Sequence, residues 1–190
     1  MSATAGVPSA VAVYCGFRPG GRPAFRAAAV EFGALLARQG VSLVYGGGGR
    51  GMMRAVADAV LDAGGTVIGV IPESLVAAEE AHTGLRPGTS GSRLEIVASM
   101  HERKARMLAL ADACAVLPGG MGTLDEMFEV LTWAQLGIHE KPCGMINVEG
   151  YFDALLRFLD EAVAQGFVSE TDHARLRVAS SPEALFALLS

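Results

Sequence analysis

The sequence predicts one α/β domain in which a parallel, doubly wound sheet carries helices on both faces. Short runs of β-branched and other apolar residues alternate with longer Ala-, Leu- and Arg-rich segments of helical length along all 190 residues. The short runs are continuously apolar, which is typical of parallel strands buried on both sides. In such sheets ligands bind beyond the carboxyl ends of the strands.

Six strands are predicted in order along the chain, at 10–15, 41–45, 66–71, 94–98, 113–118 and 143–147. Helices are expected between them. Gly40 and Gly64 stand where two of these helices should end, because glycine readily adopts the left-handed conformation of a helix terminus. Ser181 and Pro182 supply a cap residue and a first-turn proline for a last helix. The least regular segment is 72–93, which we expect to be a loop or lid, and 1–9 is expected to be a disordered tail.

Composition limits the function. A length of 190 residues allows one sizeable core, and 51% hydrophobic with 18% charged residues is typical of a globular chain. The net charge of −5 disfavours nucleic acid and anionic membranes as partners. No apolar run approaches the ~20 residues that span a bilayer, and the N-terminus lacks the pattern of a signal peptide. Three cysteines scattered within apolar runs indicate reduced core residues in a cytoplasmic protein.

Two glycine-rich loops each follow a predicted strand and precede a predicted helix, at 46–51 and 118–123. Glycine lets the backbone approach a ligand closely, and a helix N-terminus offers free N–H groups and partial positive charge. Neither loop continues into the Gly-Lys-Ser/Thr of a P-loop or matches a dinucleotide fingerprint. Each could be only a tight turn, but two such loops at strand carboxyl ends favour phosphate binding.

A second cluster of candidate residues follows the fourth strand. Ser99 and Glu102 form a capping-box pattern that predicts a helix beginning at Met100. Arg103 and Lys104 then lie in the first turns, where positive charge opposes the helix dipole by ~0.3–1 kcal/mol. An anion facing the pair would offset this cost, although a solvated helix face is the commoner fate of adjacent basic residues.

Glu126 admits two interpretations. Thr123 and Glu126 also have capping-box spacing, so the carboxylate could bond back to its own helix start. Alternatively it faces a ligand near the second glycine loop. A carboxylate beside the anomeric carbon of a ribosyl group would stabilise the positive charge that develops as the C–N bond breaks, and would orient or deprotonate the attacking water. The sequence leaves both open.

These motifs together resemble a known family. PGGMGTLDE (118–126), TWAQLGIH (132–139) and MHERK (100–104) are similar to motifs of the LONELY GUY (LOG) family, the cytokinin riboside 5′-monophosphate phosphoribohydrolases often mislabelled lysine decarboxylases. The likeness extends over nearly the whole chain. It implies a Rossmann-like homodimer that takes a small-molecule nucleoside monophosphate, uses no cofactor or metal, and releases the free base and ribose 5-phosphate from an N6-modified AMP or from AMP itself.

The resemblance also implies site residues. Arg103 and Glu126 would be the catalytic pair. The substrate would be held by residues of both glycine loops and their surroundings: Gly47, Gly48, Glu79, Lys104, Gly119, Gly120, Met121, Gly122, Thr123, Leu124, Asp125 and Thr132. Phe17 departs from the serine that many members carry after the first Cys-Gly, so the lip of that loop differs. The general acid for the departing base is not assigned.

Three other functions compete with this one. A pyridoxal phosphate decarboxylase needs a Schiff-base lysine, and the chain has only Lys104 and Lys141. A non-catalytic carrier of a nucleotide or of the molybdenum cofactor could use the same fold. A single-stranded DNA binder is disfavoured by the acidic balance. The histidines show no zinc-ligand spacing.

Overall fold

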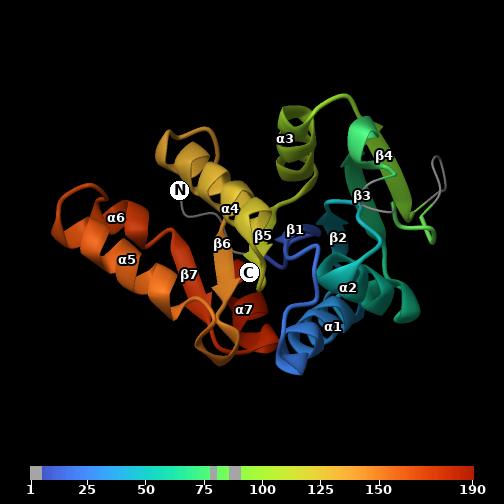
Figure 1. Cartoon of the computed structure of the whole chain (residues 1–190), viewed down its shortest axis with the longest axis horizontal. Coiled ribbons are helices and arrows are strands. Elements are labelled where there is room, and N and C mark those ends of the chain that lie inside the picture. The colour runs from blue at the N-terminus through green and yellow to red at the C-terminus, as the bar shows by residue number, and fades with distance from the viewer. Residues whose placement is uncertain (1–5, 78–80, 86–90) are drawn as a thin grey trace.

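The structure, a computed structural model, describes residues 6–77, 81–85 and 91–190. One sheet of seven parallel strands, in the order β4-β3-β2-β1-β5-β6-β7, forms its centre (Figure 1). The strands are β1 (Ala10–Tyr14), β2 (Ser42–Tyr45), β3 (Val67–Pro72), β4 (Arg93–Val97), β5 (Ala113–Val116), β6 (Cys143–Ile146) and β7 (Leu176–Ala179). The predicted fold class and all six predicted strands are confirmed, and β7 is an edge strand that the sequence analysis missed.

Helices cover both faces of the sheet (Figure 1). One face packs against α1 (Pro23–Arg38), α2 (Gly51–Asp62) and α7 (Pro182–Leu189), and the other against α3 (Met100–Leu110), α4 (Met121–Gln135) and α5 (Asp153–Ala164). The short α6 (Glu170–His173) follows α5, and 3-10 turns span Glu73–Leu75 and Val148–Gly150.

Strand β1 explains why both faces need cover. Its alternate side chains enter two separate cores: Val11 and Val13 face α1 and α2, whereas Ala12 and Tyr14 face α3 and α4. All four are almost completely buried. A strand with two buried faces has no place for a polar residue, hence the uninterrupted apolar run.

The predicted helix boundaries are confirmed. Gly40 and Gly64 adopt left-handed φ angles of 69° and 76° where α1 and α2 end. The hydroxyls of Ser99 and Ser181 cap α3 and α7 by accepting backbone N–H bonds three residues ahead. These local signals position α3 and therefore the residues of its first turn.

The irregular segment 72–93 contains the first 3-10 turn and the start of β4. Residues 78–80 and 86–90 within it, and residues 1–5 of the expected tail, lie outside the described part of the chain. Ser9 is held against the end of α3 by hydrogen bonds to Asp112. Within the described ranges no helix has the length and apolar character needed to cross a membrane.

The chain order creates a crevice beside β1. From β1 the chain adds β2, β3 and β4 on one side, and it then returns to place β5, β6 and β7 on the other. The connections after β1 and β5 therefore leave the sheet in opposite directions. Such a switch point opens a crevice at the strand carboxyl ends, where ligands of this fold class bind.

Candidate active site

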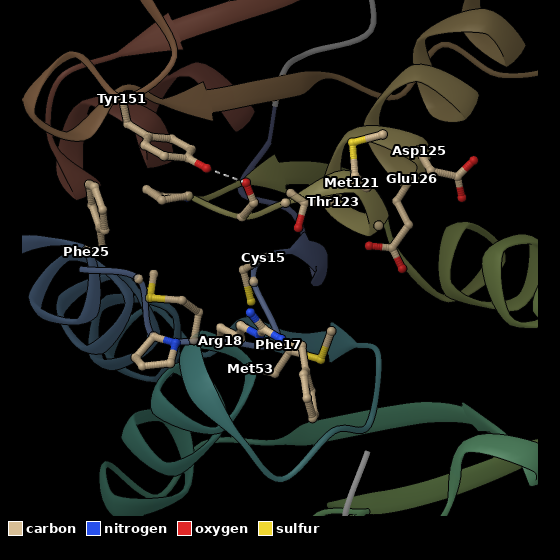
Figure 2. A pocket seen from close by; sticks show the side chains of 18 of the residues that line it. Cys15, Phe17, Arg18, Phe25, Met53, Met121, Thr123, Asp125, Glu126 and Tyr151 are labelled. Atoms are coloured by element: carbon tan, nitrogen blue, oxygen red, sulfur yellow. Dashed lines mark hydrogen bonds between the residues drawn. The ribbon is translucent and has the colours of Figure 1, made fainter. Parts of the chain in front are cut away.

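A pocket of about 410 Å³ occupies this switch point. It is lined by the β1–α1 connection (15–20), the first residues of α2 and α3, and the β5–α4 loop (118–123). Figure 2 shows Met121, Thr123 and Tyr151 on one side of it and Phe17, Arg18 and Met53 on the other. Its volume suits a small organic ligand.

The β5–α4 loop presents an open helix N-terminus to this pocket. Gly120 is the N-cap of α4, and no side chain caps it. Apart from its chain neighbours and the nearby backbone of its own helix, a Cβ atom added at Gly120 or Gly122 would meet no described atom within 4 Å. The first N–H groups of a helix lack internal partners and carry partial positive charge. This end of the pocket is therefore suited to an anion.

Glu126 faces the pocket from inside α4. Because the helix begins at Met121, Thr123 is its third residue rather than its cap, and the capping-box alternative for Glu126 does not apply. The Glu126 carboxylate lines the pocket although its residue is only 4% exposed. A buried carboxylate beside a ligand-sized space is a candidate catalytic group.

Arg103 forms an ion pair with this carboxylate. Its Nη2 lies 3.2 Å from Glu126 Oε1, and the residue is 3% exposed. The guanidinium also packs on the backbone of Gly46, where an added Cβ would overlap Nη2. Breaking such a buried pair is costly, so the two side chains hold each other in position. The structure thus brings both predicted catalytic residues to one side of one pocket.

Lys104 is not among the residues that line the pocket. Its Nζ lies 2.9 Å from Glu129 and 3.1 Å from Asp125, both carboxylates of α4. Partial burial lowers the pKa of the Lys104 ammonium, but hydrogen bonds to Glu129 and Asp125 outweigh this and leave the pKa above its usual range. The ion pairs join α3 to α4, which supports the wall of the pocket.

Apart from Lys104 and Glu79, the predicted binding residues divide into two groups. Those of the second loop line the pocket: Gly119, Gly120, Met121, Gly122, Thr123 and Asp125. Gly47, Gly48, Leu124 and Thr132 are outside its lining. Glu79 lies outside the described residues.

The pocket also contains residues that the sequence analysis did not select. Cys15, Arg18, Phe25, Met53, Met100 and Tyr151 all line it. Burial raises the pKa of the Cys15 thiol, so the group stays protonated and is unsuited to nucleophilic attack. Arg18 is exposed and extends into the pocket from the side opposite Thr123 (Figure 2). For Cys15 and Arg18, the available signal in the sequence was their position at or just after the end of the first predicted strand.

Among the described residues, no group of three or more His, Cys, Asp or Glu side chains is arranged to bind a metal ion. The groups that line the pocket include the Arg103–Glu126 ion pair, the exposed Arg18, backbone amides, the polar side chains of Thr123, Asp125 and Tyr151, and apolar side chains. Such a set can bind an anion and stabilise positive charge next to it.

The fold and this pocket define a Rossmann-like α/β protein with a ligand-sized pocket at its switch point. A sequence profile described as "Possible lysine decarboxylase" matches residues 53–189. The chain is 48% identical over 174 residues to the Cytokinin riboside 5′-monophosphate phosphoribohydrolase LOG of Oryza sativa subsp. japonica, covering 92% of this chain and 69% of that protein. It is 46% identical to LOG1 of Arabidopsis thaliana, which has the same descriptive name, over 92% of this chain and 78% of the relative. The chain belongs to the LONELY GUY (LOG) family.

Solved structures with the same fold include the molybdenum cofactor carrier protein MCP of Chlamydomonas reinhardtii. It superposes with a TM-score of 0.63 at 19% identity, covering 94% of this chain and 93% of the carrier. At this identity the likeness shows the fold alone.

Proposed function

We propose that this protein hydrolyses the N-glycosidic bond of N6-modified adenosine 5′-monophosphates and also that of AMP. The rate of hydrolysis would depend on the base. Water replaces the base at the anomeric carbon, which gives free base and ribose 5-phosphate. The observation that carries this proposal is the buried Arg103–Glu126 pair in one pocket with the open N-terminus of α4. The names of the rice and Arabidopsis relatives support the same reaction.

Glu126 is assigned the central catalytic role. As the C–N bond weakens, positive charge builds on the ribose, and the fixed, largely buried carboxylate of Glu126 stabilises it. The same group orients or deprotonates the attacking water, a contribution worth roughly 10²–10⁴-fold. Arg103 holds this carboxylate in place and binds a ribose hydroxyl or the phosphate.

The β5–α4 loop is assigned the phosphate. N–H groups at Gly120, Gly122 and Thr123 would bind its oxygens, as helix N-termini do in other phosphate sites. Phosphate binding energy then positions the ribose against Glu126, which lowers the entropic part of the barrier. Plain nucleosides, which lack this anchor, should be poorer substrates.

A lysine decarboxylase activity has less support. Lys141 donates to the carbonyl oxygens of Leu108 and Ala111 at 2.6 Å each, and Lys104 is paired with carboxylates. Neither ammonium lines the pocket. A Schiff base requires a neutral amine, whereas the Lys104 pKa is raised. No cofactor is needed for the proposed hydrolysis.

The proposal extends to assembly and location. Met121, Leu136 and Ile138 are 85%, 68% and 63% exposed at the two ends of α4, and a second copy of the chain would cover such apolar side chains in a homodimer. The three cysteines are free and buried, which supports a cytoplasmic location.

The direct test incubates the protein with isopentenyladenosine monophosphate, AMP and the corresponding nucleosides, and separates free base from intact substrate by chromatography. Glu126→Gln should lower the rate of base release by about 10²–10⁴-fold. Glu129→Gln is the matched control, because Glu129 lies one turn along the same helix and pairs with Lys104 outside the pocket. Near-normal hydrolysis by Glu126→Gln, or tight AMP binding without base release by the unmodified protein, would contradict the proposal.

A further inference from the structure

Tyr151 connects two distant segments at the mouth of the pocket. Its hydroxyl donates a hydrogen bond of 2.7 Å to the carbonyl oxygen of Gly119 (Figure 2). The ring is held by edge contacts with Phe25 and Phe152, at centroid distances of 5.1 and 4.8 Å. The residue is 43% exposed, so burial of the ring alone does not explain its placement.

The backbone before Tyr151 adopts an unusual conformation. Glu149 has a φ of 49° and Gly150 a φ of 71°, so two consecutive residues are left-handed. For a glutamate this conformation costs on the order of 1 kcal/mol. Arg22 stabilises the turn by donating to the Glu149 carbonyl oxygen at 3.1 Å. Because this strained turn lies next to the pocket and is stabilised by Arg22, it indicates that the direction of the Tyr151 side chain is important for the pocket.

The hydrogen bond from Tyr151 holds the peptide group between Gly119 and Gly120. The Pro118 carbonyl accepts from Gly16 N at 3.0 Å, and the Gly120 carbonyl accepts from Leu124 N at 3.1 Å inside α4. The peptide between Gly119 and Gly120 lies between these two fixed groups. It joins two glycines, which rotate more freely than other residues. Tyr151 is the side chain that fixes its carbonyl.

We propose that Tyr151 is a positioning residue that aims the N–H of Gly120 at the phosphate of the substrate. In a trans peptide the C=O and N–H bonds point in opposite directions. A carbonyl held toward Tyr151 therefore turns the Gly120 N–H away from Tyr151 and into the pocket. Without the hydroxyl this peptide can flip and present a carbonyl oxygen, which repels an anion. The inference rests on the proposed function, because it assigns the anion to the substrate.

Tyr151→Phe tests this by removing one oxygen atom while keeping the ring and its contacts. For isopentenyladenosine monophosphate we expect KM to rise about tenfold, the scale of one charge-assisted hydrogen bond, with kcat changed less than twofold. Turnover of the plain nucleoside should be unchanged, because it has no phosphate to lose. A merely structural role would affect both substrates alike.

Tyr45→Phe is the matched control. The Tyr45 hydroxyl is buried and forms no hydrogen bond in the described structure, so the same atom is removed without loss of a bond. Its KM for the monophosphate should stay within twofold of the unmodified protein. Equal KM values in Tyr151→Phe and Tyr45→Phe would overturn the inference.

A binding measurement separates this inference from the proposed reaction. Isothermal titration with ribose 5-phosphate and with ribose needs no hydrolysis. If the unmodified protein releases no base but binds ribose 5-phosphate about tenfold more tightly than Tyr151→Phe does, the inference holds and the proposed function fails. If both proteins hydrolyse monophosphates with equal KM, the reverse is true. No detectable difference in ribose 5-phosphate binding would also overturn the inference.

Discussion

The two glycine-rich loops look alike in the sequence but have different surroundings in the structure. Both follow a buried strand and begin a helix, the first at 46–51 and the second at 118–123. Both were expected to approach a phosphate. A run of glycines at the same place in the fold can therefore have two different physical reasons.

In the first loop, other parts of the protein fill the space beside the glycines. A Cβ at Gly46 would overlap the Arg103 guanidinium, one at Gly51 would overlap the Phe17 carbonyl, and one at Gly47 would lie 3.0 Å from Ile71 Cβ. The first N–H groups of α2 are also in use, since Met52 N donates to Gly16 O at 3.0 Å. These glycines allow close packing of protein against protein.

In the second loop, the space beside two glycines is open. A side chain at Gly120 or Gly122 would begin in a position with no described atom within 4 Å, and the α4 terminus has no side-chain cap. Gly122, inside the first turn of α4, stabilises the helix less than alanine would at that position. Its absence of a side chain is useful when a ligand occupies that space. The first loop thus packs against the Arg103 guanidinium, and the second lines the pocket.

The largest effect is expected where the first loop contacts Arg103 of the proposed catalytic pair. Gly46→Ala inserts a methyl group into the Arg103 guanidinium and displaces it from Glu126. Misplacing a catalytic group by about 1 Å can cost on the order of 10²-fold in rate. We therefore expect kcat for the monophosphate to fall about 100-fold, as measured by base release.

Gly21→Ala is the control for this change, because Gly21 has open space and an ordinary φ in the β1–α1 connection. It should leave kcat within twofold. A Gly46→Ala protein with full activity would mean that the guanidinium position is unimportant.

A smaller effect of a different kind is expected in the second loop. Gly122→Ala adds a methyl group to open space at the second position of α4. The higher helix propensity of alanine should stabilise the protein by up to about 1 kcal/mol, which corresponds to about 2–4 °C in Tm for a chain of this size. KM for the monophosphate should rise about tenfold because the methyl group obstructs the amides of this terminus. Thermal denaturation and steady-state kinetics check both, and an unchanged KM would remove the second loop from the binding site.

Arg18 should contribute less, because it is exposed and its charge is screened. Arg18→Gln is expected to raise KM for the monophosphate about threefold at low salt, and less at about 0.5 M salt. Arg26→Gln, on the exposed side of α1, controls for the change in net charge. The salt dependence distinguishes attraction of the phosphate from a change in pocket shape. A salt-independent increase would favour the latter.

The fold was predictable from the sequence wherever one strand is buried on both faces. β1 and β5 are continuous apolar runs because both of their sides are packed. Strand β7 was missed because it is not buried on both faces. It lies at the edge of the sheet, its residues Arg177 and Val178 are exposed, and its run of apolar residues is correspondingly interrupted.

The candidate site was predictable where its residues lie within one local motif. The structure brings Arg103 and Glu126 together because α3 runs back from β4 at the edge of the sheet to β5 beside the switch point, and α4 begins directly after β5. Tyr151 reaches the pocket from the connection between β6 and α5, and Phe25 reaches it from α1; no local pattern marks either residue. Lys104 is adjacent to Arg103 yet faces α4, because successive helix residues point about 100° apart.

The smallest effect on catalysis is expected from Gly47→Ala, which tests the first loop alone. Gly47 has a φ of 74° and packs against Ile71 and Leu94, so an alanine there is strained in both backbone and side chain. We expect a loss of about 1–3 kcal/mol in the free energy of unfolding, measured by urea denaturation. KM and kcat should change less than twofold in the folded fraction, because the glycine contacts protein rather than the pocket. A tenfold rise in KM without loss of stability would instead give the first loop a direct role in binding, and the two loops would then be alike in function as well as in sequence.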